Sequence, residues 1–124
     1  LTLASIQCFS VDFMKKVETW RNECIVETGI DRDSVINALS NHQYPDEAKF
    51  KEFVVCLVKK PGIMDDQGNL HPEVYKKILV SEGLSDAAAD DLVKKCVVVK
   101  GSTTDSAFNL FVCHQNSAPK DLQV

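Results

Sequence analysis

The side chains in this sequence that are best suited to chemistry are its five cysteines. Cys8 stands apart near the N-terminus, and the other four follow with the spacing Cys24-x31-Cys56-x39-Cys96-x16-Cys113. All four fall in segments with helical patterning rather than in loops. Thiols at this density in a short chain indicate disulfides formed in an oxidising compartment. Four cysteines allow three pairings, and the spacing alone does not choose among them.

Catalytic and metal-binding arrangements find little support in the sequence. Cys113 and His114 are adjacent, and neighbours along a helix do not face each other, so they make a poor nucleophile–base pair. The stretch DDQGN offers Asp65, Gln67 and Asn69 as possible calcium ligands. It lacks the glycine that a calcium-binding loop has at its sixth position, and Lys76 stands where a glutamate should close the loop. The three histidines have no zinc spacing. The sequence therefore predicts no enzyme, no metal and no cofactor.

Length and composition favour a single soluble globular domain. The chain has 124 residues, of which 44% are hydrophobic and 26% charged, which is enough for one core. The net charge of −4 provides no general basic surface for nucleic acid. No apolar run approaches the roughly 20 residues that a membrane-spanning helix needs.

The first ten residues, LTLASIQCFS, carry no charge and differ from the rest of the chain. Two interpretations stay open: a signal-peptide remnant with a cleavage point before Val11, or an N-terminal arm that packs or swaps. Cys8 is then a leftover of the signal, a free thiol or an intermolecular partner. We accordingly divide the chain into residues 1–10 and a single helical domain, 11–124, with a C-terminal tail at 116–124.

Apolar periodicity predicts helices in the first half of the chain. Asp12 is expected to cap a helix that ends at Gly29, and Asp33 to cap a short helix through about residue 40. A third helix starts in YPDEAKF, where Asp46 and Glu47 are expected in the first turn. The sequence KKPG ends it, because proline and glycine do not continue a helix comfortably.

The second half of the chain is also predicted to be helical. Pro72 suits the first turn of a helix that Gly83 ends, and the pair Ser85–Asp86 offers a cap for the next. That helix is expected to run to Gly101, although its VVV run is the one strand-like piece of the chain. The segment STTDSAFNLFVCHQ forms the last helix, with a near capping box at its start.

This order of helices and cysteines resembles the insect odorant-binding proteins, and within them the four-cysteine "minus-C" subgroup. Six-cysteine members carry two more cysteines, bridged to each other, at positions that correspond to Glu52 and Thr104 of this chain. Both are absent here, which is the joint loss that defines the subgroup. The resemblance covers about residues 11–115 and implies an all-α fold of about six short helices around a central apolar cavity.

The disulfide pairing is also implied by the resemblance, with bridges Cys24–Cys56 and Cys96–Cys113. The two positions that lack a cysteine are expected to lie close together in space. Without a bridge there, we expect that end of the domain to open more easily.

An internal cavity is expected for two reasons. Several short helices with wide apolar faces rarely all meet at one point, which favours a space between them. The resemblance makes that space the functional site of a secreted, extracellular carrier, which binds small apolar volatile molecules such as odorants, pheromones or other semiochemicals non-covalently. Candidate lining residues are Val17, Trp20, Phe53, Val54, Leu57, Ile63, Met64, Tyr75, Ile78, Leu79, Val93, Ala107, Leu110, Phe111 and His114. The alternative is that these residues form an ordinary core.

Two of these candidates are polar and could orient a ligand. Tyr75 and His114 can each make a hydrogen bond to an alcohol, ester or carbonyl, or else lie at the surface. If His114 closes the pocket, its change of charge between about pH 5 and 8 would loosen the C-terminal tail. That tail either lays Leu122 and Val124 over the opening or is frayed.

The expected partners are a small apolar ligand and a membrane receptor, with no nucleic acid. The chain is a monomer or a homodimer formed through Cys8 or the N-terminal segment. The alternative function is a secreted, disulfide-stabilised interaction or defence module, with a packed core and a protein partner. Saturable binding of an apolar probe separates the two hypotheses.

Overall fold

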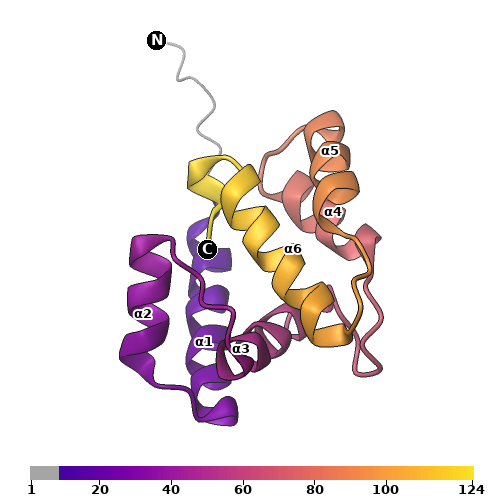
Figure 1. Ribbon diagram of the computed structural model, residues 1–124. Coiled ribbons are helices and arrows are strands. Elements are labelled where there is room, and N and C mark those ends of the chain that lie inside the picture. The colour runs from indigo at the N-terminus through magenta and orange to yellow at the C-terminus, as the bar shows by residue number, and fades with distance from the viewer. Residues whose placement is uncertain (1–8) are drawn as a thin grey trace.

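The computed structural model describes residues 9–124, which form six α-helices and one short 3₁₀ helix without a β-strand (Figure 1). The elements are α1 (Val11–Thr28), α2 (Arg32–Asn41), α3 (Ala48–Lys59), α4 (Pro72–Ser81), α5 (Asp86–Cys96), α6 (Thr103–Ser117) and η1 (Lys120–Leu122). The predicted all-α class with six helices is confirmed. Cys8 and most of the segment 1–10 lie outside the described residues. None of the described helices has the length and apolarity needed to cross a membrane.

The start of α1 differs from the prediction. Ser10, not Asp12, caps the helix: its hydroxyl oxygen accepts a hydrogen bond from the Phe13 backbone N–H at 3.1 Å. Asp12 lies in the first turn instead, where a negative charge is stabilised by the helix dipole. The predicted end is correct, because Gly29 takes a left-handed conformation with φ of 71°, which suits glycine.

Helices α2 and α3 also begin at other residues than predicted. Asp31 caps α2 by accepting a hydrogen bond from the Ser34 N–H, so the predicted cap Asp33 lies inside the first turn. In α3, Asp46 and Glu47 precede the helix and do not occupy its first turn. Such shifts of one or two residues arise because several neighbouring polar residues can serve as a cap, and tertiary contacts choose among them.

Helix α5 is shorter than predicted. It ends at Cys96 rather than at Gly101, and the chain is no longer helical over residues 97–100. The β-branched valines there favour extended backbone. The turn back into α6 is held by two hydrogen bonds, from the Asn109 side chain to the Cys96 carbonyl and from the Lys100 N–H to the Ser106 hydroxyl.

Helix α6 is the central element of the fold. It runs diagonally across the molecule, with α1 and α2 on one side and α4 and α5 on the other (Figure 1). It packs against α3 and α5, while α3 also packs against α1 and α5 against α4. The side chains most deeply buried between these helices include Phe50, Phe53, Leu79 and Leu122.

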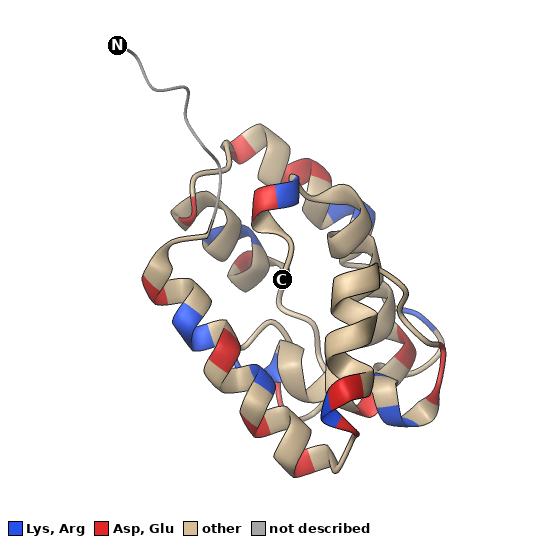
Figure 2. Cartoon of the chain, turned by 90° about the vertical axis from the view of Figure 1, so that its left-hand side faces the viewer, with Lys and Arg blue, Asp and Glu red and all other residues tan. Residues whose placement is uncertain are grey.

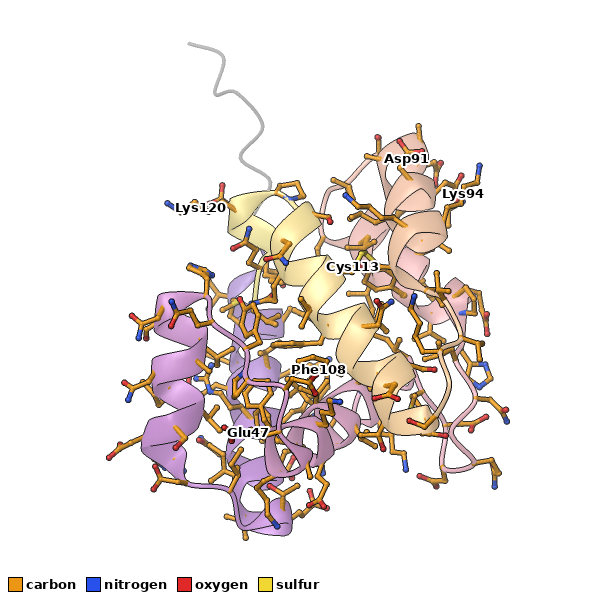
Figure 3. All side chains as sticks on the ribbon, viewed as in Figure 1. Glu47, Asp91, Lys94, Phe108, Cys113 and Lys120 are labelled. Atoms are coloured by element: carbon orange, nitrogen blue, oxygen red, sulfur yellow. A yellow bond between two sulfur atoms is a disulfide. The ribbon has the colours of Figure 1, made fainter. Side chains whose placement is uncertain are left out.

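Two disulfides join helices of this arrangement. Cys24–Cys56 links α1 to α3, and Cys96–Cys113 links α5 to α6. In Figure 3, Cys113 lies on the side of α6 that faces α5. The implied pairing is therefore confirmed.

An ion pair joins α3 to α6. The ammonium group of Lys51 lies 3.1 Å from the carboxylate of Asp105 and also contacts Asp46. It lies 5.3 Å from the ring centre of Phe108, whose label in Figure 3 marks its place on α6. Lys51 precedes Glu52 and Asp105 follows Thr104, so the ion pair links residues next to the two positions that are expected from the resemblance to lie close together.

Charged residues of both signs are interspersed along the helices (Figure 2). Some of them link neighbouring helices, as Lys60 on the α3 side does with Glu27 of α1 at 2.8 Å. Lys76 of α4 similarly lies 2.9 Å from Asp90 of α5. These exposed pairs add little stability individually, so the disulfides and the core carry the fold.

Candidate functional site

An apolar pocket of about 90 Å³ lies between α1, α3, α4 and α6. The segment between α3 and α4 and the two ends of the described chain complete its wall. The lining residues are Phe9, Phe13, Val17, Trp20, Leu57, Val58, Pro61, Ile63, Tyr75, Ile78, Leu79, Leu110, Phe111, His114 and Val124. No Lys, Arg, Asp or Glu is among them.

Helical spacing explains why these side chains meet. Phe13, Val17 and Trp20 are separated by four and three residues and therefore share one face of α1. The lining residues of α4 and α6 likewise fall within one turn of each other on their helices. Three helices thus turn an apolar face toward the same space.

Most of the predicted lining residues surround this pocket: Val17, Trp20, Leu57, Ile63, Tyr75, Ile78, Leu79, Leu110, Phe111 and His114. The remaining predicted residues lie elsewhere: Phe53, Val54, Met64 and Ala107 are buried in the surrounding core, and Val93 packs against it. Helix α3 explains part of this, because it is covered by both α1 and α6 and its apolar residues face two sides. Ligand contact remains a prediction for all of these residues.

Four pocket residues were not predicted from the sequence: Phe9, Phe13, Val58 and Pro61. Val124 also lines the pocket, as expected if the tail lies over the opening. Helical periodicity could have identified Phe13 and Val58, which belong to apolar stripes of α1 and α3. Phe9 packs on Phe13 with ring centres 4.7 Å apart, and its backbone N–H donates to the Asp121 carbonyl at 3.3 Å. No local pattern indicates that a residue before α1 reaches this pocket.

Tyr75 and His114 form a buried hydrogen-bonded pair at the pocket wall. The Tyr75 hydroxyl lies 2.6 Å from Nδ1 of His114, and Nε2 of His114 lies 2.8 Å from the Leu122 carbonyl oxygen. Since a carbonyl can only accept, Nε2 carries the imidazole proton, Nδ1 of the neutral ring accepts, and the Tyr75 hydroxyl donates.

Burial shifts the pKa of both groups toward their neutral forms. It raises the pKa of the Tyr75 phenol above its ordinary value. It lowers the pKa of His114 below its ordinary value, and the hydrogen bond to the Leu122 carbonyl opposes this only in part. The pair is therefore neutral at pH 7, and neither residue lies at the surface.

The C-terminal tail is packed against α6 rather than frayed. Leu122 is completely buried, and the Gln115 side-chain amide bonds both the N–H and the carbonyl of Val124 at 2.8 Å. The same amide donates to the Tyr44 hydroxyl. Because Val124 lines the pocket, these bonds hold the tail as part of the pocket wall.

In the loop between α3 and α4, the carboxylate of Asp65 is hydrogen-bonded by donors of the same loop. This carboxylate accepts hydrogen bonds from the backbone N–H groups of Gln67 and Asn69 and from Nε2 of His71 at 2.9 Å. Nδ1 of His71 bonds Glu73 at 3.0 Å, so both ring nitrogens donate to carboxylates. The bond from His71 contributes most to lowering the pKa of Asp65 to about 2.

One further group among residues 9–124 has metal-ligand side chains close together, namely Cys24, Glu27 and Cys56. Its two sulfur atoms are joined in a disulfide, so neither is available as a thiolate. The arrangement is structural.

Six helices, two disulfides and a partly open apolar pocket, with no Lys, Arg, Asp or Glu among the lining residues within 9–124, define a class of small disulfide-bonded helical proteins. Comparison with known proteins agrees. The chain is 24% identical over 119 residues to the B1 protein of Tenebrio molitor, and the aligned region covers 96% of this chain and 91% of that protein. It is 26% identical over 102 residues to general odorant-binding protein 69a of Drosophila melanogaster, and this alignment covers 82% of this chain and 68% of that protein.

Solved structures show the same fold. The fatty acid binding protein OBP56a of the blowfly Phormia regina superposes with a TM-score of 0.68 at 21% identity, covering 94% of this chain and 96% of that one. The THP12 carrier protein of the yellow mealworm superposes with a TM-score of 0.62 at 28% identity, covering 78% of this chain and 89% of that one.

Residues 7–117 match the PBP/GOBP family, so the chain belongs to this family. The resemblance to odorant-binding proteins is thereby confirmed, and the chain is a small-ligand carrier rather than an enzyme.

Proposed function

We propose that this protein is a secreted, extracellular carrier that binds small apolar volatile molecules non-covalently in the pocket between α1, α3, α4 and α6. The single observation that supports this most strongly is the pocket itself, which lies between four helices and has no Lys, Arg, Asp or Glu among its lining residues in the described part of the chain. Such a site favours uncharged ligands through the hydrophobic effect and dispersion contacts. The name of the Drosophila relative, a general odorant-binding protein, supports the same ligand class.

The proposal includes membership of the four-cysteine subgroup. Four cysteines form the two disulfides. In this proposal, Glu52 and Thr104 correspond to the missing pair, as the resemblance implies. The ion pair between Lys51 and Asp105 supports this alignment, because it links the two helices at the corresponding place. We also propose a membrane receptor as a partner of the carrier. The proposed assembly state is a monomer or a homodimer.

Binding of an apolar fluorophore tests the proposal. The purified, delipidated protein is titrated with N-phenyl-1-naphthylamine, and displacement by volatile alcohols, esters, aldehydes and phenols follows. We expect saturation near one probe per chain and selective displacement. Absence of saturable binding with both disulfides intact would contradict the carrier function and favour the interaction module.

A matched pair of variants locates the site. Val17→Phe adds volume to a lining residue of α1 that is only 5% exposed, and we expect it to weaken probe binding about tenfold by filling the pocket. Val26→Phe makes the same change on the same helix at a position that is 79% exposed, and should leave binding unchanged. Equal effects of the two variants would show that the probe binds elsewhere.

A further inference from the structure

The proposed carrier function leaves the chemical class of the ligand's polar group open, and the hydrogen bonds of the pocket wall bear on it. Within the described residues, three lining side chains contain a nitrogen or oxygen atom: Trp20, Tyr75 and His114. The hydrogen bonds that these three can still make decide which polar group a ligand can carry into the pocket.

Both protons of the Tyr75–His114 pair are already used. The Nε2 proton of His114 is donated to the Leu122 carbonyl, and the Tyr75 hydroxyl proton is donated to Nδ1 of His114. The phenol oxygen of Tyr75 keeps a lone pair that can accept. At this part of the wall, therefore, a ligand finds an acceptor and no available donor.

We infer that the pocket selects neutral ligands whose polar group is a hydroxyl, over carbonyl and carboxylate ligands with the same carbon skeleton. This inference rests on the proposed carrier function. An alcohol supplies its own proton to the Tyr75 oxygen and leaves no polar group unpaired. An aldehyde or ester offers only acceptor atoms, so the Tyr75–His114 pair supplies no donor to replace the hydrogen bonds that its carbonyl makes to water. A carboxylate would in addition bring a charge among lining residues that include no cation.

The indole N–H of Trp20 is the remaining donor among the lining side chains. It belongs to α1, whereas Tyr75 and His114 belong to α4 and α6. A carbonyl ligand that used this N–H would bind through α1 instead, so the experiment must separate the two contacts.

Four compounds with one carbon skeleton test the inference: benzyl alcohol, benzaldehyde, benzoate and toluene, each used at pH 7 to displace N-phenyl-1-naphthylamine. We expect benzyl alcohol to bind about tenfold more tightly than benzaldehyde, and benzoate to bind most weakly of the four. Equal or tighter binding of benzaldehyde or benzoate would overturn the inference while leaving the carrier function in place. Absence of saturable probe binding would instead contradict the carrier function itself.

Two variants then assign the contact. His114→Leu removes the acceptor of the Tyr75 proton, which becomes available to a ligand, so the preference should shift from benzyl alcohol toward benzaldehyde. The ratio of the two affinities within one variant cancels any general loss of binding that follows from the lost bond to Leu122. Trp20→Phe keeps an aromatic ring and should preserve the alcohol preference. If Trp20→Phe abolishes the preference for benzyl alcohol, the indole N–H sets the selectivity and the inference is wrong. If His114→Leu does not fold, the comparison of the four compounds in the unmodified protein still tests the inference.

Discussion

At the scale of single residues, His114 and His71 lie in opposite environments. His114 is buried and neutral between the Tyr75 hydroxyl and the Leu122 carbonyl. His71 is partly exposed and lies between the carboxylates of Asp65 and Glu73. Burial lowers the pKa of the first, and the two carboxylates raise the pKa of the second. Their effects on stability therefore change with pH in opposite directions.

His114 should make the protein less stable in mild acid. Its pKa in the folded state is below the ordinary value near 6.5, so below about pH 6.5 the unfolded state binds more protons and the free energy of unfolding falls as the pH falls. Denaturant unfolding between pH 7 and pH 5 measures this loss. His114→Gln does not titrate and should flatten the dependence; an equally steep dependence in that variant would assign the loss to another group.

His71 should contribute stability that is present below about pH 6.5 and is lost as the pH rises through its raised folded-state pKa. The effect on stability is small, because the site is exposed to solvent. Titration of the imidazole by NMR gives the pKa directly. In Asp65→Asn, which removes the main cause of the shift, we expect the pKa of His71 to return toward its ordinary value. An unchanged pKa would contradict the bond between these side chains.

At the scale of elements, α3 and α6 are joined by packing and by the Lys51–Asp105 ion pair, without a disulfide. An exposed ion pair constrains two helices much less than a covalent bridge does. We therefore expect this end of the domain to open more readily than the ends held by Cys24–Cys56 and Cys96–Cys113.

The double variant Glu52→Cys/Thr104→Cys should restore a third disulfide. The ion pair between the adjacent residues brings these parts of α3 and α6 together, so the two new thiols should meet and oxidise. Counting free thiols and mapping the bridge by mass spectrometry test this, with each single variant as the control. We expect slower amide exchange in α3 and about 2–4 kcal/mol of added stability if the bridge is unstrained. Two thiols that persist under oxidising conditions would show the alignment with the six-cysteine pattern to be wrong.

At the scale of the whole molecule, the two disulfides relate differently to the pocket. Cys24–Cys56 joins α1 to α3, and both of these helices provide lining residues. Cys96–Cys113 joins α6 to α5, and α5 provides none. Loss of either bridge removes a constraint on the unfolded chain, whereas loss of the first also allows two walls of the pocket to separate.

Replacing one bridge at a time tests this difference. Cys24→Ser/Cys56→Ser and Cys96→Ser/Cys113→Ser should each lower the free energy of unfolding by about 2–5 kcal/mol in denaturant titrations. Probe binding, measured where both variants remain folded, should weaken more in the first variant. A larger loss of binding in the second would mean that the connection of α5 to α6 controls the pocket.

The sequence predicted much of the fold, because helix formation depends largely on neighbouring residues. The stop at Gly29 and the start at Pro72 were correct, since each depends on the backbone preference of one residue. The cap of α1 at Ser10 and the end of α5 at Cys96 were not, because several local choices were open at each point. The disulfide pairing came from the family resemblance and not from the spacing.

The sequence by itself determined which faces of the helices are apolar and that four cysteines lie on helices, since both properties follow from residue type and periodicity. Only the tertiary structure decided which buried residues border the pocket, as the contrast between Leu57 and Phe53 on the same helix shows. It also brought Phe9 and Val124 to one wall and placed Tyr75 against His114. The physical reason is that burial is recorded in the local pattern, whereas the partner of a buried group is set by packing between segments far apart in the chain.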